Sequence, residues 1–216
     1  ANSLSNSIDD LNRRMSLLIQ GLSLDPTSPM LLDQFWKLAI KDLGQDPNQI
    51  LKLRVMGANT NVLEAMSGLQ SLQNGDIENA TESFRSALKK SPDLAILLNN
   101  LSTIGELRSE KNSDISVKLL NILVEISPKN ANIRENRGMI LIRNKQFTEG
   151  IKDLESILTD SNNLKEVHLA LSDAYSELGN REKADFHKVA AEKIDKPNLA
   201  QKNENADEEK NDKPAA

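Results

Sequence analysis

The sequence predicts an all-helical protein, built as a solenoid of antiparallel helix pairs. Three recurring features predict this fold. Small residues return at nearly constant intervals, glycine-containing turns lie inside these intervals, and prolines separate one interval from the next. A sequence that repeats itself every 20–50 residues indicates an array of similar supersecondary units. We therefore expect helix pairs that stack on one another.

The repeat is visible as three ladders of residues. Positions 68, 102, 138 and 172 of the first ladder are separated by 34, 36 and 34 residues, and the other two ladders have intervals of 36, 34 and 34. Small residues let two helix backbones approach closely, while the bulky Phe84, Leu120 and Leu154 are expected to fill the interface to the next pair. The ladders are Gly68, Ser102, Gly138 and Ser172; Ala80, Ser116, Gly150 and Ala184; and Ala87, Leu123, Ile157 and Ala191.

Turns and breakers fit two helices in each unit. Gly75 and Gly179 lie between the two helices of the first and last units, where glycine suits a tight turn. Pro92 and Pro128 end the first two units, because proline cannot continue a helix and restricts the residue before it. The interval of 36 residues implies two extra residues in the second unit, which we expect in a bulging loop at 109–114.

These residues resemble the tetratricopeptide repeat (TPR) family, whose unit of about 34 residues has small, large, small and proline positions in this order. The best match runs through Gly75, Ala80, Phe84, Ala87 and Pro92. The resemblance implies a right-handed α-solenoid, a TPR-like superhelix. The expected parts are N-terminal helices with a degenerate half-repeat over 1–60, four repeats over 61–94, 95–130, 131–164 and 165–197, and a disordered polar tail over 198–216.

The N-terminal part contains an amphipathic helix, because apolar residues at steps of three and four lie on one face. This helix ends before Pro26, and Pro29 opens a second helix that carries Phe35 and Trp36. Two interpretations are open: the apolar stripe packs on the Phe35 and Trp36 helix, or it stays partly free for a partner or a second copy. The stripe is Ile8, Leu11, Met15, Leu18 and Leu22.

The last unit has the features of a terminal repeat. Lys188 stands where the earlier units carry Phe84, Leu120 and Leu154. A polar residue at this position suits a helix that faces water instead of another repeat. The segment 198–216 that follows is rich in Asn, Asp, Glu and Lys, so we expect it to remain disordered.

Charge and composition exclude several classes of function. The 216 residues carry a net charge of -5 with a pI near 5.2, and they lack the basic clusters that bind nucleic acid. Cysteine is absent, which removes disulfides and zinc-thiolate sites. No apolar run approaches the roughly 18–20 residues of a membrane span. We expect a soluble protein without membrane insertion, either cytoplasmic or exported after processing before Ala1.

The sequence predicts no catalytic, metal or cofactor site. Its two histidines, His168 and His187, both belong to the last unit and are candidates to approach each other across its helix pair. They lack the spacing of known zinc motifs. A serine nucleophile elbow and a phosphate-binding glycine loop are also missing. We therefore expect a protein that is not an enzyme.

In TPR arrays the first helix of each pair lines the concave surface, which the resemblance makes the candidate groove for a partner. The family's carboxylate clamp would need Lys and Asn at positions that here hold Ala65, Asn99 and Glu135, so the clamp is absent. Glu135 and Asp173 favour a neutral or basic segment. The groove candidates are Asn99, Asn100, Thr103, Glu106, Glu135, Met139, Arg143 and Asp173, with Ala65, Leu69, Ile142, Leu169 and Ser176 at further positions of the same helices. The alternative is that several of these residues, Leu69 and Ile142 above all, pack between helices.

Two functions follow from these features. The first is a scaffold that binds a peptide or helix of another protein in the concave groove. The alternative is a structural element that self-associates, or joins a larger array, through the N-terminal stripe. Asn100 and Asn136 occupy equivalent places in consecutive units, and each is a candidate either to fix a turn or to contact a ligand.

Overall fold

The computed structural model describes residues 2–43, 48–55, 57–108 and 110–195, and the side chains of 9–43, 50–55, 57–103 and 114–194 within them. The tail predicted over 198–216 lies outside the described residues. The described residues form helices and no strand, so the predicted all-α solenoid is confirmed. The N-terminal part contains α1 (Asn2–Leu24), α2 (Pro29–Lys37), a π-helical turn η1 (Leu38–Asp42) and α3 (Asn48–Val55).

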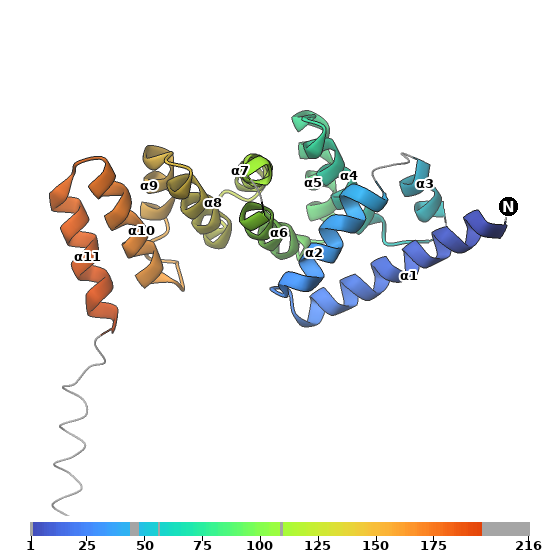
Figure 1. Ribbon diagram of the computed structural model, residues 1–216, viewed down its shortest axis with the longest axis horizontal. Coiled ribbons are helices and arrows are strands. Elements are labelled where there is room, and N and C mark those ends of the chain that lie inside the picture. Colours follow the sequence, from blue (N-terminus) through green and yellow to red (C-terminus); the bar gives the residue numbers. More distant parts are fainter. Residues whose placement is uncertain (1, 44–47, 56, 109, 196–216) are drawn as a thin grey trace, which may run out of the picture.

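Four antiparallel helix pairs follow, and each helix packs most extensively on its partner in the pair. In the last three pairs successive first helices also touch, since α6 contacts α8 and α8 contacts α10. The pairs follow one another along the long axis of the molecule, with α1 to α3 at one end and α11 at the other (Figure 1). The pairs are α4 (Thr60–Gln73) with α5 (Ile77–Lys90), α6 (Leu94–Arg108) with α7 (Glu110–Ile126), α8 (Ala131–Arg143) with α9 (Phe147–Glu155), and α10 (Leu164–Glu177) with α11 (Arg181–Asp195).

Side chains at the helix starts satisfy backbone donors that the helix itself leaves unpaired. Asn59 accepts hydrogen bonds from the backbone N–H groups of Asn61 and Val62 at 3.0 and 3.3 Å. Asp76 and Asn130 act in the same way at the starts of α5 and α8. Asparagine and aspartate therefore set where these helices begin.

The turn inside a pair needs one residue in the left-handed region. Gly75 and Gly179 have φ angles of 81° and 76°, as their place between the helices predicted. The third pair uses Lys145 at the equivalent position, with φ of 61°. A positive φ is uncommon for a residue other than glycine. Because this turn contains no glycine, a search for glycine does not find it.

The second pair accommodates its two extra residues in a helix and not in a loop. The predicted bulging loop at 109–114 is wrong, because α7 already begins at Glu110 and runs for 17 residues, against 14 in α5. The insertion therefore lengthens the second helix. Adding residues to a helix keeps their backbone groups hydrogen-bonded, whereas a loop would leave them to solvent.

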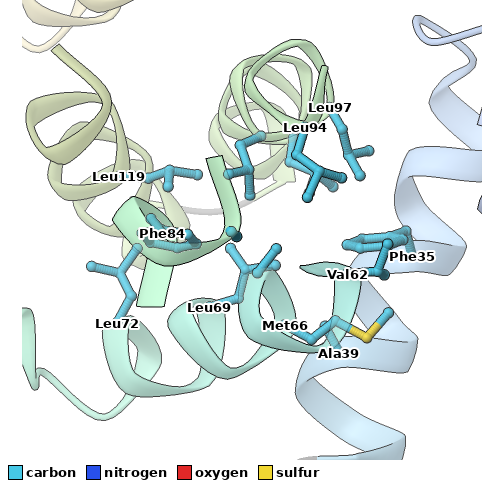
Figure 2. Packing of buried hydrophobic residues seen from close by; sticks show 14 of the residues in the cluster. Phe35, Ala39, Val62, Met66, Leu69, Leu72, Phe84, Leu94, Leu97 and Leu119 are labelled. Carbon is cyan, nitrogen blue, oxygen red and sulfur yellow. The ribbon is translucent and has the colours of Figure 1, made fainter. Parts of the chain in front are cut away.

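The ladder glycines allow close contact within a pair. A Cβ atom on Gly68 would lie 2.6 Å from a ring carbon of Phe84, and one on Gly138 would lie 2.7 Å from a methyl carbon of Leu154. Phe84 thus fills the space beside Gly68 inside its own pair. Leu119 of the next pair lies close to the Phe84 ring (Figure 2). The bulky residues therefore serve the pair as well as the interface to the next one.

The N-terminal stripe packs inside the chain. Leu11, Met15 and Leu22 are buried and Leu18 is half-buried, whereas the side chain of Ile8 lies outside the described residues. Their helix, α1, contacts α2 and α3 (Figure 1). For Leu11, Met15, Leu18 and Leu22 the structure shows the packed interpretation. The hydrogen bond of 2.9 Å between the Arg14 guanidinium and the carboxylate of Asp42 adds a polar contact between α1 and η1.

The apolar residues form two clusters. The first extends from α1 to α8 and includes the fully buried Phe35 and Phe84, and Figure 2 shows part of it. The second joins the last two pairs around Leu154, Leu171 and Tyr175. Each cluster includes residues from more than one helix pair, and α8 contributes to both. Stacked repeats require such shared clusters, since one helix pair cannot bury its own apolar face. In the part of the chain that the structure describes, no helix is long and apolar enough to cross a membrane.

Candidate protein-interaction site

The predicted groove residues do not all serve the same purpose. Three of them, Asn99, Asn100 and Glu135, come together at a pocket between α6 and α8 with a volume of about 250 Å³. The loop residues Asn130 and Asn163, which the repeat register does not predict for this site, line it as well. The pocket is lined by Ala95, Ile96, Asn99, Asn100, Asn130, Asn132, Ile133, Glu135, Asn136 and Asn163.

Asn99 lines this pocket from α6. Its side chain is only 7% exposed, and its Oδ1 atom has no hydrogen-bond partner among the described residues. An unpaired buried acceptor destabilises a folded protein, so such atoms in native structures often mark a place where a water or ligand binds. Asn99 therefore remains a candidate for ligand contact.

Asn100 has a structural role. Its Nδ2 atom donates a hydrogen bond of 2.7 Å to the backbone carbonyl of Pro26, in the turn between α1 and α2. The contact joins the N-terminal hairpin to the first helix of the second repeat, 74 residues later in the sequence. Of the two roles left open for Asn100, fixing a turn is the one that the structure shows. Asn136 lines the pocket and keeps a role in ligand contact open.

Glu135 is buried and connects α8 to the segment before α10. Its Oε2 accepts a hydrogen bond of 2.7 Å from the Ser161 hydroxyl, and its Oε1 accepts one of 2.6 Å from the side-chain amide of Asn163. The Ser161 hydroxyl in turn accepts the backbone N–H of Asn163 at 3.0 Å. Glu135 thus holds the entrance to the last repeat, with neutral donors around a buried carboxylate.

The other candidates are divided between surface and core. Arg143 and Asp173 are exposed, Met139 is half-buried against the second apolar cluster, and Thr103 bonds the backbone carbonyl of Asn100 in its own helix at 2.8 Å. The side chain of Glu106 lies outside the described residues. Three of the further positions on these helices face the packed interior, which is the alternative left open for Leu69 and Ile142 and a correction for Ala65. These are Ala65, Leu69 and Ile142.

The two histidines meet across the last helix pair, as their positions had suggested. Nδ1 of His168 on α10 lies 2.8 Å from Nδ1 of His187 on α11, a distance at which one ring N–H donates to the other ring nitrogen. The His187 ring also stacks on Tyr175 at a centroid distance of 5.7 Å. Tyr175 donates a hydrogen bond of 2.5 Å to Glu155, and Lys183 donates one of 2.8 Å to the Tyr175 hydroxyl. A polar chain thus joins α9, α10 and α11.

Burial lowers the pKa of both histidines. Desolvation is the cause for His168, and for His187 it is the largest cause, followed by the neighbouring His168. Glu155 acts on His187 in the opposite direction, and Lys183 lowers its pKa further. The pair is therefore neutral near pH 7. Among the described residues, no group of three or more His, Asp or Glu side chains is arranged to hold a metal ion.

The lowered pKa values predict that the last repeat loses stability in mild acid. An unfolded histidine titrates near pH 6.5, so protons bind the unfolded chain first as the pH falls. The stabilisation from the neutral pair is complete above about pH 6.5 and is lost as the pH falls through the lower folded pKa values. Thermal unfolding between pH 7 and 5.5 should show a falling melting temperature, with a flatter profile for the double variant His168→Gln, His187→Gln. Identical profiles would contradict this account.

The helix pairs, their turns and the ladder contacts define a helical-repeat protein with a TPR-like fold. No protein-family model and no curated protein matches the sequence. A solved structure of a MamA mutant is 25% identical to this chain and has a TM-score of 0.52. The match covers 63% of this chain and 98% of the MamA chain. MamA of AMB-1 is 22% identical, with coverages of 82% and 98% and a TM-score of 0.45. YrrB, described as a TPR protein with an unusual peptide-binding site, is 15% identical, with coverages of 84% and 94% and a TM-score of 0.46.

Proposed function

We propose that this protein is a non-enzymatic scaffold that binds an extended segment of a partner protein across the first helices of its repeats. The observation that carries the proposal is the asparagine-lined pocket between α6 and α8. It lies between the first helices of two successive repeats, so a segment that crosses from one repeat to the next would pass over it. The unpaired Oδ1 of Asn99 adds a hydrogen-bond acceptor that awaits a donor.

The side chains around the pocket match a peptide backbone. An asparagine amide both donates and accepts hydrogen bonds, as a peptide group does, so several of them can pair with an extended chain. Asn132 is exposed and Asn136 is half-buried. Ile96 is 55% exposed at the same site and offers an apolar contact. Polar pairing and one apolar anchor together are typical of peptide recognition.

Charge favours a neutral or basic segment. Glu135 lies at the pocket, and Asp173 is exposed on the first helix of the last repeat. An acidic segment would meet like charge at both places, whereas a neutral or basic one would not. This preference is opposite to that of a carboxylate clamp.

Ile96→Ala should weaken peptide binding about tenfold, because it removes an apolar contact of the order of 1.4 kcal/mol at the pocket. Random peptides displayed on phage would be selected on the full chain, and the affinity of enriched peptides measured by fluorescence anisotropy. Val189→Ala is the matched control, since Val189 is 47% exposed on α11, in the second helix of the last pair. Equal weakening by both variants, or no enriched peptide at all, would overturn the proposed function.

A further inference from the structure

We propose that the pocket between α6 and α8 receives one basic side chain, an arginine or a lysine, from the bound segment. This inference rests on the proposed function and adds a chemical preference to it. Three properties of the pocket carry it: an unpaired buried acceptor, a buried carboxylate that neutral groups surround, and a volume that suits a single side chain.

The unpaired acceptor is Oδ1 of Asn99, on a side chain that is 7% exposed. A hydrogen-bond donor for this atom can approach through the pocket that Asn99 lines. The torsional energy about χ2 of asparagine has broad minima. The amide group of Asn99 can therefore rotate and direct its oxygen toward an incoming group. Arginine carries five N–H donors and lysine three, with no acceptor on either, so both suit a site that lacks a donor.

The carboxylate is that of Glu135, which is 6% exposed. Its partners, Ser161 and Asn163, are neutral donors, and each carboxylate oxygen keeps a lone pair for another hydrogen bond. A buried negative charge is most favourably paired with a cation. Among the described residues that line the pocket Glu135 is the one charged group, and a basic side chain of a ligand would place a cation beside it.

The size of the pocket restricts its occupant. Pockets for complete small-molecule ligands are typically about 300–1,000 Å³. The volume here, about 250 Å³, is smaller and suits one long side chain. Ile96 and Ile133 line it together with the asparagines, and such apolar groups can contact the aliphatic stem of arginine or lysine while the polar groups meet its head.

An NMR titration of the full chain tests this inference with small probes. The probe is Nα-acetyl-arginine amide, and Nα-acetyl-citrulline amide is its matched neutral analogue of nearly the same shape. We expect the arginine probe to shift the side-chain amide signals of Asn99 and Asn136, and the citrulline probe to bind about tenfold more weakly because it lacks the charge. Equal affinities, or tighter binding of an acetyl-glutamate amide, would overturn the basic preference.

Two variants separate this site from a general effect on folding. Asn99→Leu removes the unpaired acceptor, so its melting temperature should equal or exceed that of the parent while binding of the arginine probe falls about tenfold. Glu135→Gln keeps one acceptor oxygen and removes the charge, so the difference between arginine and citrulline should vanish. Unchanged discrimination by both variants would contradict the site.

The phage selection distinguishes peptide binding by the scaffold from the preference of the pocket for a basic side chain. Enriched peptides in which no basic residue recurs would contradict the basic pocket and leave peptide binding in place. An absence of enriched peptides, together with a normal response to the arginine probe, would contradict the peptide scaffold alone. Both proposals expect enriched peptides with a recurrent arginine or lysine whose replacement by citrulline or glutamine lowers affinity about tenfold.

Discussion

Phe84→Ala should lower the free energy of unfolding by about 3–5 kcal/mol, the usual cost of truncating a fully buried aromatic side chain. The Phe84 ring is 0% exposed and covers Gly68, whose missing Cβ leaves the room that the ring occupies. Leu72 and Leu119 lie beside it from two different repeats (Figure 2). Its loss would therefore open a cavity at a point where two repeats meet.

Chemical denaturation followed by circular dichroism measures this effect, and Phe186→Ala is the matched control. Phe186 is 65% exposed on α11, so the same truncation there should change the free energy of unfolding by less than about 0.5 kcal/mol. A loss below about 1 kcal/mol for Phe84→Ala, or similar losses for the two variants, would contradict the packing described here.

Asp153→Ala should lower the free energy of unfolding by about 3 kcal/mol. The side chain of Asp153 is 2% exposed and holds two cations, with Arg137 donating from Nε and a terminal nitrogen at 2.5 and 2.7 Å and Arg134 at 3.2 Å. Removing one partner of a buried ion pair typically costs about 3–5 kcal/mol. The arginine side chains are 20% and 25% exposed, so water can reach them, which places the cost at the lower end.

The control for Asp153 is Asp114→Ala. Asp114 pairs with Lys118 one turn along the same helix, but the Asp114 side chain is 66% exposed. Exposed pairs of this kind contribute about 0.3–0.5 kcal/mol. Urea unfolding of the three proteins should place Asp114→Ala close to the parent, and an equal effect of the two substitutions would contradict the assigned role of Asp153.

The sequence predicted most of the fold, because the repeating helix pairs leave a regular spacing of residues that can be recognised. Small residues such as Gly68 and Gly138 had to recur wherever two helices cross closely, so their spacing gave the helix pairs. Glycine also marked the turns at Gly75 and Gly179. The turn at Lys145 was hidden, since its positive φ is imposed by the two helices that it joins rather than by its own preference. The greater length of α7 could not be predicted either, because the repeat spacing shows that two residues are inserted but not whether they extend a loop or a helix.

The site was harder to predict than the fold. Register placed Asn99, Asn100 and Glu135 on one surface, but it could not show which partner each side chain would find. Asn100 is engaged by a carbonyl 74 positions earlier in the chain, and Glu135 by the segment before α10. Such long-range contacts depend on how the repeats stack. The one partial sequence signal for the site was the abundance of asparagine near the starts of the first helices. It indicates a polar surface but does not show which side chain has an unpaired acceptor.

The most direct test of the scaffold is an NMR map of where the tightest selected peptide binds. We predict that the largest shifts on titration fall on α6 and α8, at the side-chain amides of Asn99, Asn132 and Asn136. The exposed Phe186 and Val189 on α11, and Met30 at the start of α2, provide alternative apolar surfaces. Shifts centred on any of these residues, with the three asparagine amides unchanged, would contradict the account.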